Sequence, residues 1–367
     1  MSERKKNIDW IILLLTVCLM LMSIAFVYSA SASIAEARYG NSDTLFWSHI
    51  IKVLFGFLVL VVCMRIDYHI WAKYSKVLIF LSVLSLILVL FSGTTINGAN
   101  RWLYIGPINF QPSELAKFAL VLHFSVILTE RQEFIKEFKY GILPLLVWSL
   151  IICGFIAVQP NFSSAVVIYI IAVAMMFIGN ANLKHILSIG IISVFALLIY
   201  AISASYRMAR LEHYIGLSDN SNGIPKAAFQ SHQAIIAFGS GGLWGIGPGQ
   251  SRQSLLFLPE AYGDFIYSII GEEYGFIGAV FIILIFVVLA YRGIKIARAA
   301  PDLFGYFLAF GITFTISFYA FVSASVNTGL LPTTGLPLPL ISYGGSAIII
   351  YCAVIGILLN ISSQANK

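Results

Sequence analysis

Long apolar runs recur along the 367-residue chain, separated mostly by short polar segments. A helix needs roughly 20 apolar residues to cross the hydrocarbon core of a bilayer, and ten runs come close to that length or exceed it. The pattern therefore predicts an all-α polytopic membrane protein with about ten transmembrane helices. The runs lie near residues 10–29, 46–64, 75–92, 112–129, 141–158, 164–179, 185–203, 264–291, 303–327 and 344–361.

The first run also fits a second interpretation. Arg4, Lys5 and Lys6 precede it and the small residues 29–32 follow it, which is the order found in a secretory signal peptide. However, the apolar stretch is longer than the roughly 7 to 15 residues of a signal core, and nine further runs follow it. We therefore expect a first transmembrane helix. Either interpretation sends the next segment to the outside.

The composition agrees with a membrane protein, because 59% of the residues are hydrophobic, 10% are charged and the mean hydropathy is +0.92. Soluble domains carry about 25% charged residues. Disorder, collagen-like repeats and a secreted disulfide scaffold are thereby excluded. The four cysteines stand singly in apolar runs, and the six histidines show no paired ligand spacing. We expect neither disulfides nor a zinc site.

The basic residues are spread between the apolar runs and form no single stripe, so the net charge of +6 does not predict a nucleic-acid partner. Their distribution follows the positive-inside rule. With the N-terminus inside, 14 of the 22 Lys and Arg residues fall in inner segments, which places both termini in the cytoplasm. These are Arg4, Lys5, Lys6, Arg65, Lys73, Lys76, Arg131, Lys136, Lys139, Lys184, Arg292, Lys295, Arg298 and Lys367.

Three outer loops, at about 93–114, 204–263 and 328–343, are long and rich in Gly, Pro, Asn and aromatic residues. Irregular backbone near a bilayer persists only where protein buries it or where it lines a water-filled cavity. We therefore expect an outward-facing cavity in a single membrane domain that covers residues 1–367.

Glu114 and Lys117 stand near the start of the fourth predicted helix, after Pro112, a residue that suits a first helical turn. Three residues apart, they share one helix face. Charges within a bilayer are unfavourable unless they pair or face a polar cavity. Two interpretations stay open: a structural ion pair that fixes helix packing, or a cavity-lining pair in which Lys117 meets a phosphate and Glu114 holds it in place.

Four carboxylates gather where the eighth predicted helix begins. Glu260 and Asp264 lie at its outer mouth, whereas Glu272 and Glu273 lie roughly 12–14 Å deeper at about 1.5 Å per residue. A partly desolvated carboxylate at the mouth can accept a proton from a hydroxyl group, while the deeper two are expected to bind helix ends or neighbours. From spacing alone, Asp264 is an equally good candidate for the helix N-cap.

Six glycines lie within residues 239–249. No Gly-Lys-Ser/Thr follows, so the segment is not a nucleotide-binding loop. We expect a tight re-entrant turn whose backbone can approach a ligand closely. The last outer loop, residues 331–346, has too many prolines and glycines for a helix but is apolar, so we expect it to tuck back into the protein.

Five motifs follow one another along the chain. They are Asn97-Gly98-Ala99-Asn100-Arg101-Trp102 through Phe110-Gln111-Pro112-Ser113-Glu114-Leu115-Ala116-Lys117; Gln159-Pro160; Gln233-Ala234 with Gly241-Gly242 and Gly247-x-Gly249-x-Ser251; the block from Leu258 to Glu273; and Leu331-Pro332 through Gly344-Gly345-Ser346. In this order they resemble the SEDS family (shape, elongation, division and sporulation), the FtsW, RodA and SpoVE group of peptidoglycan glycosyltransferases. The resemblance covers nearly the whole chain and is strongest to the division branch.

The resemblance implies a multi-pass enzyme of the bacterial cytoplasmic membrane, at the division septum, that joins lipid II units at the outer face. The GlcNAc 4-hydroxyl of the acceptor would attack the anomeric carbon of the donor MurNAc with inversion, and the lipid diphosphate would leave. In the family the essential acid precedes Phe-Ile in the eighth-helix block, which here is Asp264. The resemblance therefore favours Asp264 as general base. It also implies a partner, a class B penicillin-binding transpeptidase, with other divisome or elongasome membrane proteins.

The charge that develops on the diphosphate calls for cations. Lys117 and Arg101 come first because they lie in family motifs. No cofactor is implied, although a divalent cation could share this task; no Asp-x-Asp sequence indicates one. The predicted substrate- and diphosphate-binding residues are Lys117, Glu114, Arg101, Arg207, Arg210, Arg252, Glu260, Ser251 and Ser342.

The chain departs from the family pattern in three places. Asn161 follows Gln159-Pro160 where the family generally has Asp, so a carboxylate is lost. Ser254 stands where Lys is frequent, and Tyr262-Gly263 replaces His-Thr. None of these changes removes the key acid or the Glu–Lys pair, so we expect an active enzyme.

Two other function classes compete with a polymerase. A lipid II flippase or other transporter also needs intramembrane charge, but it needs a path through both leaflets, and only Glu272 and Glu273 are carboxylates near mid-depth. A non-catalytic division scaffold would tolerate loss of the acid at 264. The retained Asp264 counts against that scaffold.

Overall fold

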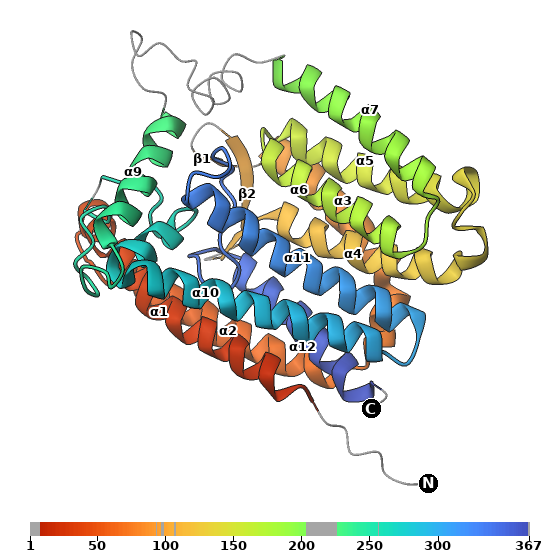
Figure 1. Cartoon of the computed structure of the whole chain (residues 1–367), viewed down its shortest axis with the longest axis horizontal. Coiled ribbons are helices and arrows are strands. Elements are labelled where there is room, and N and C mark those ends of the chain that lie inside the picture. Colours follow the sequence, from red (N-terminus) through yellow and green to blue (C-terminus); the bar gives the residue numbers. More distant parts are fainter. Residues whose placement is uncertain are drawn as a thin grey trace.

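The computed structural model describes residues 8–92, 94–96, 99–105, 108–202, 226–255 and 257–365. Its helices form a bundle in which α1 begins and α12 ends at the same end of the molecule (Figure 1), as the charge distribution predicts. The long helices are α1 (Trp10–Tyr39), α2 (Thr44–Arg65), α3 (Tyr68–Ser92), α4 (Pro112–Glu130), α5 (Leu143–Val158), α6 (Phe162–Ile178), α7 (Leu183–Ile202), α9 (Lys226–Gly241), α10 (Ile266–Ala299), α11 (Leu303–Asn327) and α12 (Ala347–Gln364).

Each of the ten predicted apolar runs corresponds to one helix, although residues 264–265 and 344–346 precede the starts of α10 and α12. In the described residues, eight helices are long and apolar enough to cross a membrane, and α6 and α7 contribute shorter apolar stretches. The main difference in length is at α1, which continues beyond the predicted end at residue 29 to a left-handed Gly40. Its Ser- and Ala-rich extension is helical, so the first run continues without a break.

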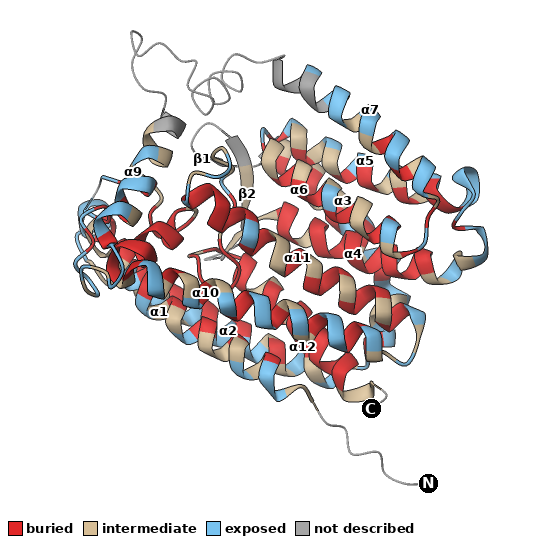
Figure 2. Ribbon diagram, in the orientation of Figure 1, coloured by how far each residue is buried: buried red, intermediate tan, exposed pale blue. Residues whose placement is uncertain are grey.

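The core of the bundle lies on α4, α11 and α12 (Figure 2). In an apolar stretch of 18 residues in α4, 83% is buried, against 28% in the equivalent stretch of α3. Helices at the periphery of the bundle, such as α3, leave many apolar side chains exposed. Lipid covers this surface in a membrane. Small residues let α2 and α12 approach closely: a Cβ on Gly356 would lie 2.5 Å from the carbonyl oxygen of Leu60.

The outer segments are more ordered than the sequence predicts. Strands β1 (Thr94–Ile96), β2 (Ala99–Ile105) and β3 (Ile108–Phe110) form an antiparallel sheet in the order β1-β2-β3. The helix α9 lies in the second outer segment, which was expected to be a loop. Both lie at the end of the bundle opposite the start of α1 (Figure 1). Two short helical turns, η1 (Gln132–Phe134) and η2 (Phe138–Ile142), connect α4 to α5.

Helix α10 is kinked at Gly275, whose backbone angles are φ 67° and ψ −168°. A positive φ of this kind favours glycine because other residues lack the conformational freedom. The kink separates a short outer part of α10 from the long part that runs to the cytoplasmic end.

Candidate active site

The last outer loop joins two segments that are far apart in sequence. Ser342 Oγ donates to the carbonyl of Gly263 at 2.7 Å, and the backbone N–H of Tyr343 donates to the carbonyl of Tyr262 at 2.9 Å. Farther along the loop, Ser346 Oγ accepts a hydrogen bond of 2.9 Å from the backbone N–H of Gln111. The expected tucked-back loop is therefore confirmed, and it connects the start of α4 with the segment that precedes α10.

Asp264 lies in that segment, two residues before α10 begins at Ile266. The N-cap position is occupied by Phe265, without a side-chain capping bond, so Asp264 does not cap the helix. A Cβ on Gly335 would lie 3.3 Å from Asp264 Oδ2, so the last outer loop passes closely over the carboxyl group. Gly335 has φ +70°, a conformation that glycine adopts without strain.

The pKa of Asp264 is raised to about 7, first because burial disfavours the charged carboxylate and then because Glu260 is close. The cationic Arg101 acts in the opposite direction. An acid with a pKa near neutrality is partly deprotonated at neutral pH and can both take up and release a proton. Glu260 itself has a left-handed backbone (φ 59°) and its carbonyl accepts from the N–H of Gly263 at 3.0 Å, which closes a tight turn before Asp264.

Arg101 on β2 is held by the connection between α5 and α6. Its Nε donates to the carbonyl of Gln159 at 3.3 Å, and its terminal nitrogen donates to the carbonyl of Pro160. Two family motifs are thereby joined. At the departure from the family pattern, Asn161 Oδ1 accepts a hydrogen bond of 2.7 Å from Ser164 Oγ at the start of α6.

The predicted pair of Glu114 and Lys117 is present, with 2.8 Å between Glu114 Oε2 and Lys117 Nζ. Lys117 is 1% exposed. Its ammonium also donates to Tyr351 OH at 2.9 Å and lies 3.8 Å from the ring centroid of Tyr319. The cation is thus surrounded by protein groups, which favours the structural interpretation of the pair.

Glu272 organises the segment that follows the glycine-rich turn. It accepts from Ser251 Oγ at 2.5 Å and from the backbone N–H groups of Arg252 and Gln253 at 3.2 and 3.3 Å. The expectation that the deeper carboxylates bind neighbouring groups is confirmed. Ser254, at the second departure, donates its Oγ to the carbonyl of Ser251 at 2.8 Å and belongs to the same loop.

The glycine-rich turn approaches α10. A Cβ on Gly245 would lie 2.1 Å from the carbonyl oxygen of Glu273, and one on Gly275 would lie 2.4 Å from the backbone nitrogen of Gly245. The N–H of Gly247 donates to Glu273 O at 3.0 Å, and that of Phe276 donates to Gly242 O at 2.8 Å. The tight turn is confirmed, and its close backbone partner is the kink of α10.

Sequence reasoning missed Asn327, the fully buried last residue of α11. Its Nδ2 donates to the carbonyl of Asp264 at 3.0 Å, and its Oδ1 accepts from Ser268 N at 3.0 Å and Ser268 Oγ at 2.7 Å. An amide at the end of an apolar run, shortly before a glycine, was the available signal.

The remaining predicted substrate-binding residues form no hydrogen bond or salt bridge with Asp264 in the part of the chain that the structure describes. The Arg252 side chain is exposed, while Ser251 and Ser342 are buried with their hydroxyl groups bound to protein. Arg207 and Arg210 lie outside the described residues. Among the residues that the structure does describe, no group of three His, Cys, Asp or Glu side chains could hold a metal ion.

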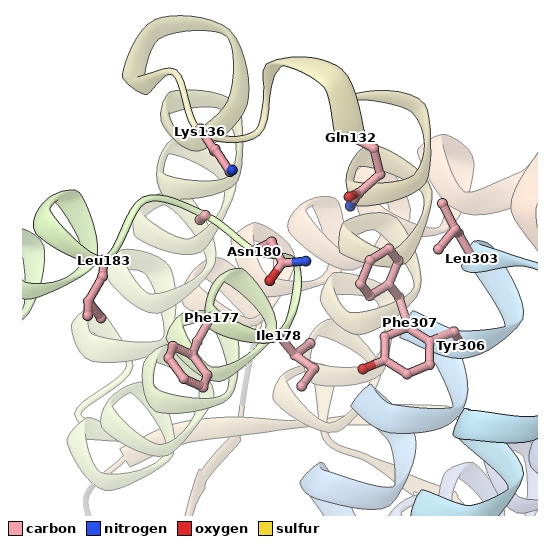
Figure 3. Close-up of a pocket in the computed structure, with 10 residues that line it drawn as sticks. Gln132, Lys136, Phe177, Ile178, Asn180, Leu183, Leu303, Tyr306 and Phe307 are labelled. Carbon is pink, nitrogen blue, oxygen red and sulfur yellow. The ribbon is translucent and has the colours of Figure 1, made fainter.

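A cavity of about 700 Å³ lies at the other end of the bundle, where α4 and α6 end and α11 begins (Figure 3). Gln132, Lys136, Asn180 and Tyr306 are among its lining residues. Because Asp264 lies at the opposite end, this cavity is separate from the candidate active site.

Residues 9–367 match the sequence pattern of a family described as "Cell cycle protein", FTSW_RODA_SPOVE. A "Probable peptidoglycan glycosyltransferase FtsW" of Geobacter sp. (strain M18) is 39% identical, over 99% of this chain and 98% of the relative. "Stage V sporulation protein E" of Bacillus subtilis (strain 168) is 35% identical over 99% of each chain.

Solved structures agree with this assignment. A chain from "Structural coordination of polymerization and crosslinking by a peptidoglycan synthase complex" is 25% identical, with a TM-score of 0.79 over 97% of this chain and 98% of that one. The rod shape determining protein RodA of Thermus thermophilus has the same fold, with a TM-score of 0.72, 24% identity and 98% coverage of both chains. The chain therefore belongs to the FtsW, RodA and SpoVE family of cell cycle proteins.

Proposed function

We propose that the protein polymerises lipid II into glycan strands at the outer face of the cytoplasmic membrane, with Asp264 as general base. The family is described as cell cycle proteins, and a relative named "Probable peptidoglycan glycosyltransferase FtsW" is 39% identical over nearly the full chain. The substrate, the face of the membrane and the catalytic residue are the proposal.

The single observation that carries the mechanism is the environment of Asp264. Its carboxyl group is only partly exposed, has a pKa of about 7 and lies directly before α10 under the loop at Gly335. As the GlcNAc 4-hydroxyl oxygen bonds to the anomeric carbon, its proton passes to Asp264. The bond between that carbon and the diphosphate oxygen breaks, so the configuration inverts and the lipid diphosphate leaves with the electron pair.

Cations stabilise the charge that develops on the leaving diphosphate. Arg101 has the strongest support, because its positive charge acts on Asp264 directly and its position is fixed by Gln159 and Pro160. The exposed Arg252 is a second candidate. Lys117 is buried among Glu114, Tyr351 and Tyr319, which supports a role in holding α4, α11 and α12 together rather than direct contact with the substrate.

The partner and the location are proposals at a finer level. The chain is a multi-pass membrane protein, and one similar solved chain belongs to a peptidoglycan synthase complex. We infer a class B penicillin-binding transpeptidase as partner and the division septum as the place of action. Both rest on the resemblance to the division branch, with which the names of the relatives agree.

The test is polymerisation by the purified complex with its transpeptidase. Lipid II is added and glycan polymer is followed on a gel for the wild type and for Asp264→Asn. We expect a loss of about 10²–10⁴-fold in rate, the range for a general base. Asp43→Asn is the matched control, because Asp43 precedes α2 at the outer end and makes no capping bond to the helix.

Polymer from the wild type and the control, but not from a well-folded Asp264→Asn protein, supports the assignment. Polymer from Asp264→Asn at the wild-type rate would support the glycosyltransferase activity but overturn the role of Asp264 as general base. Bound lipid II without polymer in any complex would favour a flippase or a scaffold.

A further inference from the structure

Lys52 is a buried cation that no family motif accounted for. It lies in α2, about 12 Å below the outer start of that helix at about 1.5 Å per residue. Lys52 is only 8% exposed. In the part of the chain that the structure describes, none of the salt bridges involves Lys52. A buried charge without a counter-ion is unfavourable, so the presence of Lys52 at this position calls for a reason.

The side chain of Tyr343 is the main contact of this ammonium group. Lys52 Nζ donates to Tyr343 OH at 2.9 Å and lies 4.1 Å from the ring centroid. Ser48 Oγ lies 3.2 Å from the same phenolic oxygen. When Lys52 and Ser48 both donate to this oxygen, the phenolic proton remains for an acceptor on the exposed side, because Tyr343 is only partly buried.

Tyr343 connects Lys52 to the active site. Its backbone N–H donates to Tyr262 O at 2.9 Å, and the two rings meet edge to face at 5.5 Å between centroids. The neighbouring Ser342 bonds to Gly263, the residue before Asp264. The phenol of Tyr343 is therefore held by residues that are adjacent in sequence to the catalytic carboxyl group.

The charges around this point favour an anion. The positive charge of Arg101 acts on Asp264, and that of Arg38, at the outer end of α1, acts on Tyr262. Lys52 contacts Tyr343, which packs on the same turn, so three cations from three elements act on this turn or on its immediate neighbour. The carboxylate of Glu260 is the acidic group that acts on both Tyr262 and Asp264.

We propose that Lys52 is a positioning residue for a diphosphate subsite, in which it orients the hydroxyl group of Tyr343 toward the diphosphate of the lipid-linked substrate beside Asp264. This inference rests on the proposed function, because the diphosphate is the anion that a lipid II polymerase binds and releases. Tyr343 donates the hydrogen bond to the diphosphate, and Lys52 strengthens that donor and supplies the long-range positive charge.

A purely structural role for Lys52 would have a different signature. As a tie between α2 and the last outer loop, Lys52 would affect the melting temperature of the protein but not its relative affinity for charged and uncharged lipids. The test must therefore measure ligand affinity separately from stability.

The experiment measures binding of undecaprenyl diphosphate and of uncharged undecaprenol to the full-length protein in detergent. We expect Lys52→Met and Tyr343→Phe to weaken binding of the diphosphate about tenfold, the size of a lost hydrogen bond to a charged group. Lys52→Arg should stay within about threefold of the wild type, because it keeps the charge and a donor. Lys73→Met, at an exposed position on α3, is the control, and undecaprenol binding should not change in any variant.

Wild-type affinity for the diphosphate in folded Lys52→Met and Tyr343→Phe proteins would overturn the subsite. If Lys52→Met fails to fold, Tyr343→Phe decides: an unchanged diphosphate affinity overturns the inference and a selective loss supports it. The polymerisation assay separates the two levels of proposal. If the wild type makes polymer and the variants keep their diphosphate affinity, the proposed function stands and the subsite is overturned. If the variants selectively lose diphosphate binding but the wild type makes no polymer, the subsite stands and the proposed function is overturned.

Discussion

The side-chain amide of Asn327 donates a hydrogen bond of 3.0 Å to the backbone carbonyl of Asp264. The two residues are 63 positions apart, and the amide is fully buried at the end of α11. The same side chain accepts two hydrogen bonds from Ser268 in the first turn of α10. Asn327 therefore fixes both the acid and the helix that follows it.

Replacing Asn327 with Ala should lower both stability and activity. The change leaves the N–H and hydroxyl groups of Ser268 and the carbonyl of Asp264 without this partner, and each buried group left unsatisfied costs about 1–3 kcal/mol. The melting temperature and the polymerisation rate measure the two effects. Thr328→Ala, one position along, is the comparison, because its hydroxyl group bonds only to carbonyls within its own helix. Equal behaviour of the two variants would contradict a special role for Asn327.

The polymerisation rate should fall as the pH drops below about 7. Asp264 acts as a base only when it is deprotonated, and burial raises its pKa to about 7. Arg101 lowers that pKa, so Arg101→Met should move the acid limb of the pH profile to higher pH. Initial rates between pH 5 and 9, at saturating lipid II, measure the shift. A limb that stays in place would show that another group controls it.

The same carboxyl group makes a prediction for stability. Its pKa is higher in the folded protein than the ordinary value near 4, so the folded state holds the proton more tightly than the unfolded state. Its contribution to stability is therefore present at low pH and is lost as the pH rises from about 4 to about 7. Melting temperatures at pH 5 and pH 8 should differ less for Asp264→Asn than for the wild type.

Removing one member of the Glu114–Lys117 pair should lower the stability of the protein more than removing both. Lys117→Met leaves the Glu114 carboxylate buried without its partner, and removal of one member of a buried pair typically costs about 3–5 kcal/mol. Glu114→Gln with Lys117→Met removes both charges and should recover part of that loss. A double-mutant cycle on thermal stability measures the coupling. Additive losses would mean that the two charges do not depend on each other.

Gly245→Ala should disrupt the re-entrant turn. Its Cβ would lie 2.1 Å from the carbonyl oxygen of Glu273, and its φ of +83° is unfavourable for alanine. Gly239→Ala is the control, because nothing lies within 4 Å of a Cβ at that position in α9. Proteolysis from the outer face, together with thermal melting, should distinguish the two variants. A wild-type melting curve for Gly245→Ala would contradict this packing.

The sequence predicted the features that the bilayer itself imposes. The positions of the membrane helices follow from the length of apolar runs, and the contact of Glu114 with Lys117 follows from their spacing on one helix. By contrast, α9 and the three-stranded sheet were not predicted, because these elements are too short or too polar to carry a membrane signal. They depend on the packing of the outer segments.

The site was predictable only in part, for a related reason. Asp264 stands out because an acid at the mouth of an apolar helix is unusual. Asn327, Tyr343 and Lys52 acquire their roles from partners that lie far away in sequence, at Asp264, Tyr262 and Tyr343 respectively. No local pattern contains such pairings. The resemblance to a family marked the motif that contains Tyr343, but not the hydrogen bonds that it forms.

The kink at Gly275 divides α10 into two mechanically different parts. Backbone groups beside the kink bond to the glycine-rich turn: Glu272 O accepts from Ile246 N at 3.0 Å, and Phe276 N donates to Gly242 O at 2.8 Å. The outer part of the helix is therefore bound to the glycine-rich turn and, through Asp264 and Ser268, to Asn327 at the end of α11. A tilt of the long inner part, such as a bilayer of different thickness imposes, is therefore expected to bend α10 at Gly275 rather than to displace Asp264.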